Sequence, residues 1–316
     1  MKILVIGAGA IGGYFGGRLL EAGRDVTFLV RPKRAAQLAE TGLVIKSRLG
    51  DVALAKPPTI QSQELRRPFD LILLSLKAYD LEAAIDSFSA AVGPETAILP
   101  LLNGMSHLDL LDRRFGKDRV LGGAVLLLSA TLDDQGRILH LNDGHILGFG
   151  EREGLRSPRI EAIAREFAGV KTEARASTQI MLEMWEKWVF IAGLAGITCL
   201  MRASIGDIAA AGGAPLSLQL LEECRAIAAG SGFAPRPEVI ERLRALLTAA
   251  GSPFTASMLR DIEHGGRTEA DHVIGDLVRR GERVLPPGLS VLRLAYANLK
   301  AYEARRAREH PQAANW

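Results

Sequence analysis

KILVIGAGAIGG, residues 2–13, opens the chain with an apolar run that ends in a cluster of glycines. The aliphatic and β-branched residues of Lys2–Ile6 predict a short buried strand, and the apolar spacing of Ile11–Glu21 predicts a helix. Between them, Gly7-Ala8-Gly9-Ala10-Ile11-Gly12 matches the pattern G-x-G-x-x-G. That match is weak alone, but a strand before it and a helix after it are the context of a dinucleotide-binding fingerprint.

Each glycine of this loop has a separate physical task. Gly7 permits the tight turn, Gly9 lets the backbone approach a pyrophosphate, and Gly12 lets the helix pack on the sheet. The helix N-terminus also offers unpaired N–H groups and the positive end of its dipole to phosphates. We therefore predict that residues 7–12 bind a dinucleotide, with a glycine-rich turn that binds nothing as the alternative.

The residues after the second predicted strand, Asp25–Val30, indicate which dinucleotide binds. NAD-binding proteins place an acidic residue there to accept a hydrogen bond from the ribose 2′-hydroxyl. This chain has Arg31, Lys33 and Arg34 instead, and a guanidinium pairs well with a 2′-phosphate. The sequence therefore favours NADPH over NADH. Solvated loop charges are the alternative, which fits Lys33 and Arg34 better than Arg31.

The first half of the chain alternates predicted strands and helices. Further strands are expected at 43–46, 52–55, 69–76, 97–102, 120–129, 137–141 and 145–150, and helices at 35–41, 81–92, 108–115 and 160–167. This alternation is typical of an α/β fold with a Rossmann-type, doubly wound and mostly parallel sheet.

The second half has helical periodicity alone. Helices are predicted at 178–201, 216–230, 237–250, 268–281 and 288–308. We therefore expect an NADP-binding Rossmann domain at 1–176 and an all-α substrate and catalytic domain at 177–316. The apolar helices allow pairing in a homodimer, and burial within one chain explains them equally well.

Composition excludes several other classes. With 48% hydrophobic and 24% charged residues the chain is an ordinary globular protein, and a net charge of +3 is too small to indicate a nucleic-acid partner. The apolar run Trp188–Met201 is short of the roughly 20 residues that cross a bilayer, so it predicts a core helix and no membrane partner. The two cysteines form no disulfide framework, and the glycine fingerprint excludes a signal peptide. We expect a cytoplasmic protein.

Polar residues end two buried strands abruptly. Lys77 follows LILLSL, and Asn103 follows ILPLL. Ligands in this fold class lie beyond the carboxyl ends of the strands, so both are candidates for contact with a nicotinamide or a substrate. Ordinary loops also need polar residues. The six histidines have no metal-ligand spacing, and we predict no metal site.

Five segments, in order along the chain, resemble the ketopantoate reductases, also called 2-dehydropantoate 2-reductases. They are ILVIGAGAIGGYFGGRL, SLKAYDL, LLNGM, EKW and SMLRDIEHGGRTEADHVIGDLVRRG. The resemblance implies an NADPH-dependent reduction of a 2-keto acid to a 2-hydroxy acid, as in pantothenate biosynthesis. It matches Lys187 to the family's catalytic lysine, and it assigns catalytic or binding roles to Asn103, Ser257 and Glu269.

In that picture Lys187 binds the ketone oxygen and protonates it, and Asn103 orients Lys187 and the cofactor. Ser257 binds the substrate carboxylate, and Glu269 anchors a substrate hydroxyl. A solvated surface lysine is the alternative for Lys187, although it lies between Trp185 and Trp188. For Glu269 the alternative is an ordinary helix N-terminus capped by Thr268.

The chain departs from the family at two positions. The helix that carries the lysine usually has asparagines four and eight residues later, where this chain has Ile191 and Ala195. These spacings keep both on the lysine's face of the helix, so the substrate contacts there become apolar. We predict a related, more apolar 2-keto acid as substrate. A non-catalytic NADPH-binding sensor and a dehydrogenase of a larger hydroxy acid are the alternatives.

Overall fold

A computed structural model describes residues 1–285 and 290–309. The chain forms two compact units. The first comprises Met1–Leu102 and His107–Glu183, and the second comprises Asn103–Ser106 and Met184–Trp316. A short piece of the first half, Asn103–Ser106, thus belongs to the helical unit. The division at residues 176 and 177 stays a prediction about domains.

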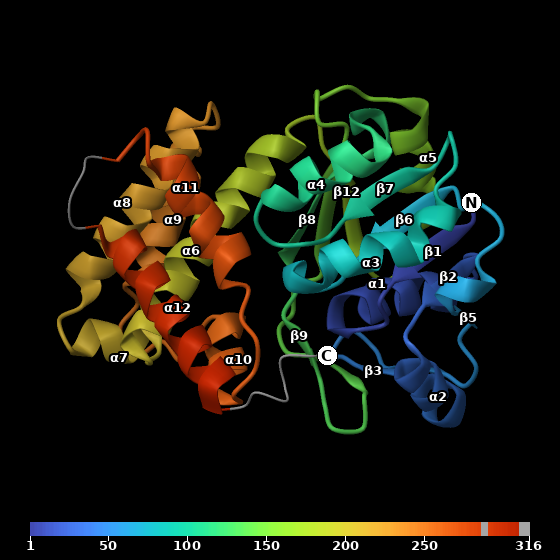
Figure 1. The fold of residues 1–316 in the computed structure, drawn as a ribbon, viewed down its shortest axis with the longest axis horizontal. Coiled ribbons are helices and arrows are strands. Elements are labelled where there is room, and N and C mark those ends of the chain that lie inside the picture. The colour runs from blue at the N-terminus through green and yellow to red at the C-terminus, as the bar shows by residue number, and fades with distance from the viewer. Residues whose placement is uncertain (286–289, 310–316) are drawn as a thin grey trace. The chain divides into compact units, whose positions relative to one another are not determined.

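A five-stranded parallel sheet with the order β5-β2-β1-β6-β7 forms the centre of the first unit (Figure 1). Its strands are β1 (Ile3–Ile6), β2 (Val26–Leu29), β5 (Thr59–Ile60), β6 (Leu71–Leu74) and β7 (Ala97–Pro100). Ile3 is in register with Val26 on one side and with Leu71 on the other. All residues of β1, β6 and β7 are buried, as expected for parallel strands covered on both faces. The predicted α/β class is confirmed.

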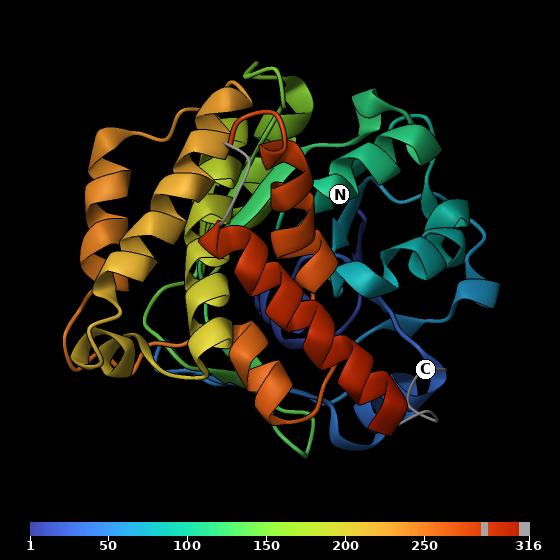
Figure 2. The same ribbon diagram turned by 60° about the vertical axis from the view of Figure 1, so that its left-hand side comes forward.

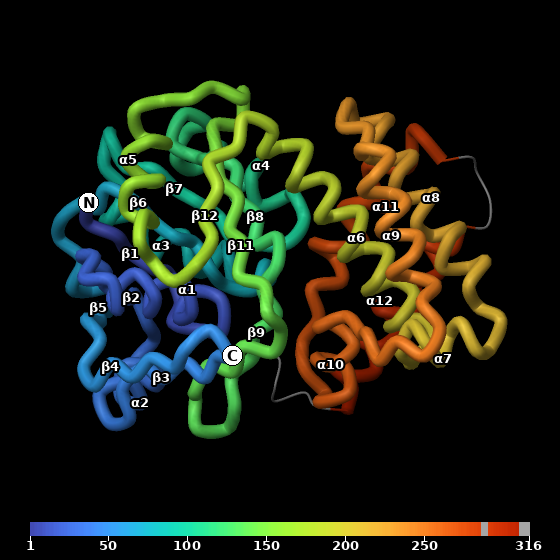
Figure 3. Tube along the Cα trace, turned by 180° about the vertical axis from the view of Figure 1, so that it is seen from behind, coloured from blue at the N-terminus to red at the C-terminus, as the bar shows by residue number. Residues whose placement is uncertain are grey.

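The remaining strands form two further sheets rather than extending the first. One has the order β4-β3-β10-β9 and the other β12-β11-β8, and both contain antiparallel pairs. Figure 3 shows β8, β11 and β12 side by side. Their strands are β3 (Leu43–Lys46), β4 (Val52–Leu54), β8 (Gly122–Leu127), β9 (Ala130–Leu132), β10 (Ile138–His140), β11 (Ile146–Gly150) and β12 (Glu173–Ala176).

Helix α1 (Ala10–Glu21) packs closely on strands of two sheets through its glycines. A Cβ atom on Gly16 would lie 2.6 Å from the ring of Phe28 in β2, and one on Gly17 would lie 2.8 Å from side chains of β3. The other helices of the first half are α2 (Pro32–Thr41), α3 (Leu81–Phe88), α4 (Ser106–Phe115) and α5 (Pro158–Phe167). The glycines that follow the fingerprint therefore serve packing.

The second unit is helical, as predicted (Figure 2). Its helices are α6 (Ile180–Met201), α7 (Ile205–Ala210), α8 (Ala214–Gly230), α9 (Pro237–Leu247), α10 (Ser257–Glu263), the π-helical η5 (Asp271–Gly275), α11 (Asp276–Gly281) and α12 (Val291–Glu309). The expected helix at 268–281 is thus divided, and the expected start of α12 at 288 falls outside the described residues. Helices α7 and α10 were not predicted, because both are short.

Helix α6 is longer than its predicted apolar run. By length and composition its 22 residues could cross a membrane, but 72% of an 18-residue apolar stretch within this helix is buried inside the protein. Since Trp188–Met201 covers only the second part of this helix, the shortness of that run does not exclude a membrane span. Burial supports the core-helix assignment instead.

Candidate functional site

The glycine loop has the geometry that its three assigned tasks require. Gly7 has a φ of +91°, and a Cβ atom there would lie 2.6 Å from the Ser75 carbonyl oxygen. A Cβ atom on Gly12 would lie 2.2 Å from the carbonyl oxygen of Gly7. A Cβ atom on Gly9, in contrast, would meet no atom within 4 Å. Gly7 and Gly12 are needed by the protein's own packing, whereas the space at Gly9 is open for a ligand.

The N-terminus of α1 fits an anionic group. Gly9 is its N-cap, and no side chain caps the first turn. The first backbone N–H groups of the helix are therefore available, and the helix dipole favours negative charge there. Ala8 is buried, whereas Ala10 and Ile11 are partly exposed beside the loop. These residues fit the pyrophosphate of a dinucleotide.

Topology brings three predicted cofactor residues to one edge of the sheet. Gly7, Arg31 and Lys77 follow β1, β2 and β6, which are neighbouring parallel strands. Arg31 is the N-cap of α2, its side chain is 70% exposed, and its guanidinium lies 3.6 Å from the carboxylate of Asp80. Lys77 is partly buried and precedes the short helix η2 (Ala78–Asp80). This edge is where the fold class binds dinucleotides.

Arg34 is not a solvated loop charge, and that alternative is wrong for this residue. Its Nε donates a hydrogen bond to the carbonyl oxygen of Ala8 at 3.1 Å, and its other nitrogens donate to Gln37 at 2.6 Å and to the Gly136 carbonyl at 3.1 Å. Burial lowers the pKa of this guanidinium. Arg34 therefore braces the glycine loop against α2 and the turn before β10. Lys33 is exposed, in agreement with a solvated role.

Lys187 is partly buried on α6 and is not a fully solvated surface lysine. Its neighbours Trp185 and Trp188 are 2% and 1% exposed. Burial lowers the pKa of the Lys187 ammonium from 10.5 to about 8, and the negative charge of Glu269 opposes this shift. A lysine with such a pKa can both bind an oxygen as a cation and give up a proton near neutral pH.

Glu269 is 9% exposed and precedes the π-helical turn η5. The predicted Thr268 cap is not the N-cap of η5, which is Ala270 with no side-chain cap. The Thr268 hydroxyl instead accepts a hydrogen bond from the Ala270 N–H at 3.4 Å and donates one to Glu303 at 2.6 Å. Glu269 nevertheless differs from an ordinary first-turn acid, because its carboxylate is buried and interacts with the charge of Lys187. Single π-helical turns are frequent at functional sites.

A contact between Trp188 and η5 connects the segments that carry Lys187 and Glu269. The indole N–H of Trp188 donates a hydrogen bond to the carbonyl oxygen of Val273 at 2.8 Å. Both partners are buried, and they lie next to Lys187 and close to Glu269 in the sequence. The contact therefore fixes the helix of the lysine against the segment that carries the carboxylate.

The Asn103 segment is anchored in the same unit by His272, which sequence reasoning missed. The Ser106 hydroxyl lies 2.8 Å from Nδ1 of His272, and the ring also forms a hydrogen bond with the backbone of Asn103. Gly104 has a φ of +73°, and a Cβ atom there would lie 2.9 Å from the His272 carbonyl oxygen. Burial lowers the pKa of His272. Asn103 is thus held to the turn that follows Glu269.

The remaining predicted residues have different surroundings. Ser257 is exposed as the first residue of α10. Ile191 is partly exposed on α6, whereas Ala195 is 4% exposed and offers little surface. The predicted site residues therefore fall into two groups. The first unit holds the predicted cofactor residues except Asn103, and the second holds Asn103 with the other catalytic and substrate residues.

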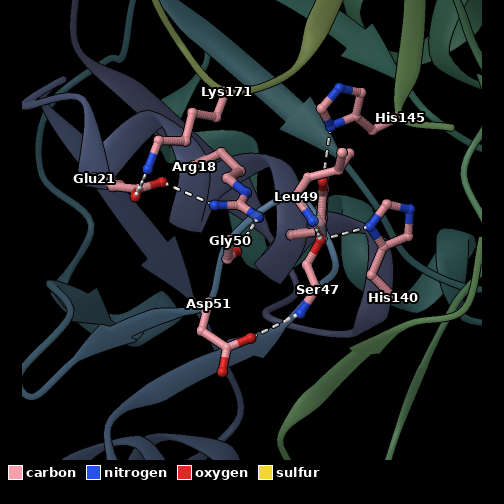
Figure 4. A network of polar contacts seen from close by, with 10 residues as sticks. Arg18, Glu21, Ser47, Leu49, Gly50, Asp51, His140, His145 and Lys171 are labelled. Carbon is pink, nitrogen blue, oxygen red and sulfur yellow. Dashed lines mark hydrogen bonds and ion pairs between the residues drawn. The ribbon is translucent and has the colours of Figure 1, made fainter. Parts of the chain in front are cut away.

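His140 and His145 belong to a polar network around α1 (Figure 4). Neither histidine is among the predicted cofactor or catalytic residues. Their rings stack with centroids 6.2 Å apart. The Ser47 hydroxyl lies 2.8 Å from His140, and the Tyr14 hydroxyl lies 2.9 Å from His145. The buried Arg18 extends the network by donating to the Gly50 carbonyl oxygen at 2.6 Å. Among the described residues no group of three or more His, Cys, Asp or Glu side chains could hold a metal ion.

Two family models match the chain. Residues 3–154 match the model of ketopantoate reductase PanE/ApbA, and residues 179–303 match the C-terminal model of the same family. An uncharacterized oxidoreductase, YkpB of Bacillus subtilis, is 41% identical over 97% of this chain and 100% of its own length.

Solved structures have the same fold. The 2-dehydropantoate 2-reductase from Methylococcus capsulatus is 27% identical, with a TM-score of 0.84 over 97% of this chain and 98% of its own. A ternary structure of D-mandelate dehydrogenase with NADH and anilino(oxo)acetate is 21% identical and has a TM-score of 0.84. It covers 97% of this chain and 99% of its own, and at that identity it shows the fold alone.

Proposed function

Because the chain is an oxidoreductase of the ketopantoate reductase family, we propose that it uses NADPH to reduce a 2-keto acid to a 2-hydroxy acid. The observation that carries this proposal is the partly buried Lys187, whose lowered pKa and neighbouring Glu269 charge suit a general acid. The glycine loop and Arg31 supply a site for the phosphates of the cofactor.

The reduction divides the work between the cofactor and the chain. The nicotinamide, when bound, supplies a hydride to the ketone carbon. Lys187 hydrogen-bonds the ketone oxygen, stabilises the negative charge that develops there, and transfers the proton that completes the hydroxyl group. Glu269 stabilises the ammonium, and with ketopantoate as substrate it would also anchor the hydroxyl group. Asn103, held by His272, orients the reacting groups, and Ser257 binds the substrate carboxylate through its hydroxyl.

The substrate is the finer part of the proposal. Ile191 is partly exposed four residues after Lys187, so an aliphatic side chain stands where the family usually has an amide. A site that lacks hydrogen-bond partners loses discrimination for a hydroxyl group. We therefore propose a 2-keto acid that is more apolar than ketopantoate, with ketopantoate itself as the reference substrate.

A substrate panel tests both the reaction and its specificity. Phenylglyoxylate and 2-ketoisocaproate are expected to reach kcat/KM values equal to or above that of ketopantoate, measured by NADPH absorbance. Ile191→Asn should shift the preference back toward ketopantoate by about 10-fold, because a restored hydrogen bond to a hydroxyl contributes roughly 1–2 kcal/mol. A kcat/KM for ketopantoate that is several orders of magnitude above that of every other acid would contradict the proposal of a more apolar substrate.

A non-catalytic NADPH sensor is the second candidate, favoured only by the apolar residues at Ile191 and Ala195. Single-turnover mixing of the protein, NADPH and the same panel separates the two. Oxidation of NADPH with any 2-keto acid supports the reductase. NADPH that binds but stays reduced with every acid supports the sensor.

Arg31→Ala tests the cofactor assignment. It is expected to raise the Kd of NADPH by about 10-fold, since a charge-assisted contact to phosphate contributes roughly 1.5–3 kcal/mol before screening at an exposed site. The Kd of NADH should change little, because NADH has no 2′-phosphate. Fluorescence titration of both nucleotides measures the difference. Equal losses for NADPH and NADH would refute the 2′-phosphate contact.

The pH dependence follows from the lowered pKa of Lys187. The protonated ammonium is the acid, so log kcat/KM should be level below pH 8 and fall by one per pH unit above about 8. A lysine with the ordinary pKa of 10.5 would keep the profile level to higher pH. Because the Glu269 charge raises the pKa of Lys187, Glu269→Gln should move the break to lower pH. If the pH of the break is the same in Glu269→Gln as in the wild type, the charge of Glu269 does not act on Lys187.

We also propose that the protein is cytoplasmic and assembles as a homodimer. Cys199 and Cys224 are both free and buried, and burial raises the pKa of the Cys199 thiol to about 12. Such thiols are inert and fit a reducing compartment. The helical unit leaves some apolar side chains exposed, such as Leu294 at 48% exposure, and a second copy would cover such surface.

A further inference from the structure

Opposite charges meet at the edge of the sheet where the glycine loop ends. Arg31 follows β2, and Asp80 is the last residue of η2, which follows β6. Both strands are direct neighbours of β1, so the two side chains come from the strands that flank the glycine loop. A guanidinium nitrogen of Arg31 lies 3.6 Å from a carboxylate oxygen of Asp80. The residue predicted to meet a 2′-phosphate therefore already has an anionic neighbour.

The two partners differ in how firmly they are placed. The Arg31 side chain is 70% exposed, whereas that of Asp80 is 27% exposed. The backbone N–H of Asp80 donates a hydrogen bond to the Lys77 carbonyl oxygen at 2.9 Å, which fixes the turn that carries the carboxylate. A phosphate that binds the exposed Arg31 guanidinium also meets the Asp80 carboxylate, whose backbone is held in place.

Arg34 does not replace Arg31 as the phosphate partner. Each of its three guanidinium nitrogens donates to a protein acceptor, namely Ala8, Gln37 and Gly136. Because Arg34 is partly buried and makes these contacts, its guanidinium stabilises the glycine loop. Arg31 has the exposed guanidinium, so its pairing with Asp80 bears directly on cofactor choice.

We propose that Asp80 is a cofactor-specificity residue, which competes with the 2′-phosphate for Arg31 and keeps the preference for NADPH over NADH below what Arg31 alone would give. This inference rests on the proposed function, in which Arg31 meets the 2′-phosphate. The inference goes beyond that function, because it assigns to Asp80 a weakening of the discrimination between NADPH and NADH. Asp80 carries one negative charge close to the place where the phosphate would carry nearly two.

The size of the effect follows from electrostatics at an exposed site. Charges about 6 Å apart in a water-like medium interact weakly, and salt screens them further, so the repulsion changes a Kd by roughly 3-fold to 10-fold. NADH has no charge at this position, so the Kd of NADH should depend little on the charge of Asp80. The specificity ratio therefore isolates the effect better than either Kd alone.

Asp80→Asn removes the charge and keeps the shape. The Asp80 side chain makes no capping hydrogen bond to α3, and asparagine is as good an N-cap as aspartate, so the variant should fold normally. We expect the Kd of NADPH to fall by about 3-fold to 10-fold at low salt, and that of NADH to change less than 2-fold. In 0.5 M salt the gain for NADPH should shrink.

Two further variants make the test specific. Asp86→Asn removes a charge from helix α3, which directly follows Asp80. Asp86 is 83% exposed and pairs with Arg114 at 3.0 Å, so this variant should leave both Kd values unchanged. In an Arg31→Ala background, Asp80→Asn should bring a smaller gain for NADPH, because the competition for Arg31 is gone and only the direct repulsion between Asp80 and the phosphate is left to relieve. A full gain in that background would show that Asp80 does not act through Arg31.

An unchanged NADPH-to-NADH ratio in folded Asp80→Asn protein, checked by fluorescence titration and thermal melting, overturns the inference while leaving the reductase proposal intact. Wild-type protein that binds neither nucleotide is a different result. It would refute the cofactor assignment, and the inference that depends on it.

Discussion

Lys187→Ala is expected to lower kcat by about 10²–10⁴, the range that a general acid contributes, while the Kd of NADPH changes little. Alanine removes both the cation that stabilises the developing oxyanion and the proton that neutralises it. The glycine loop and Arg31, which the proposal assigns to cofactor binding, lie in the other unit and are untouched. Steady-state rates with the best acid of the substrate panel and NADPH titration measure the two effects separately.

Two controls sharpen this prediction. Lys56→Ala removes an exposed lysine of the first unit and should leave kcat unchanged. Lys187→Arg keeps the positive charge, but a guanidinium does not give up its proton near neutral pH, so it should restore little of the rate. A Lys187→Ala protein with the wild-type rate would remove Lys187 from the mechanism.

The central sheet could be predicted because its strands are continuous apolar runs bounded by polar residues. β1, β6 and β7 are entirely buried, and the hydrophobic pattern alone locates them. The division into three sheets could not be predicted, since partner choice among later strands depends on long-range packing. β12 was missed because its sequence, Glu-Ala-Arg-Ala, has no large apolar residue, and β5 because it has two residues.

Residues of the candidate site could be predicted where the residue type and a motif together indicate a role. Gly7, Gly12 and Lys187 follow from the loop pattern and the family resemblance. Arg34 and His272 could not be found in this way, because their partners are far away in the sequence. Arg34 contacts a carbonyl 102 residues away, and the hydroxyl bound to His272 is 166 residues away. Only the fold shows that these side chains brace loops rather than face solvent.

Gly9→Ala is expected to raise the Kd of NADPH by about 10-fold to 10²-fold and to leave the fold intact. An added Cβ atom at Gly9 meets no protein atom within 4 Å, and the φ of −83° suits any residue. The open space is where the pyrophosphate is expected to approach the backbone. Forcing a methyl group into a packed contact costs roughly 1–3 kcal/mol, which corresponds to this loss of affinity.

Gly12→Ala is the matched comparison, because its added Cβ atom would lie 2.2 Å from the Gly7 carbonyl oxygen. That variant should lose both cofactor affinity and thermal stability, since the turn itself must shift. Gly9→Ala should lower only the affinity, with a Tm within a few degrees of the wild type. NADPH titration and thermal melting of both variants distinguish the two tasks. If Gly9→Ala binds NADPH as well as the wild type, the pyrophosphate does not pass over this loop, and the phosphate site must lie elsewhere on the sheet edge.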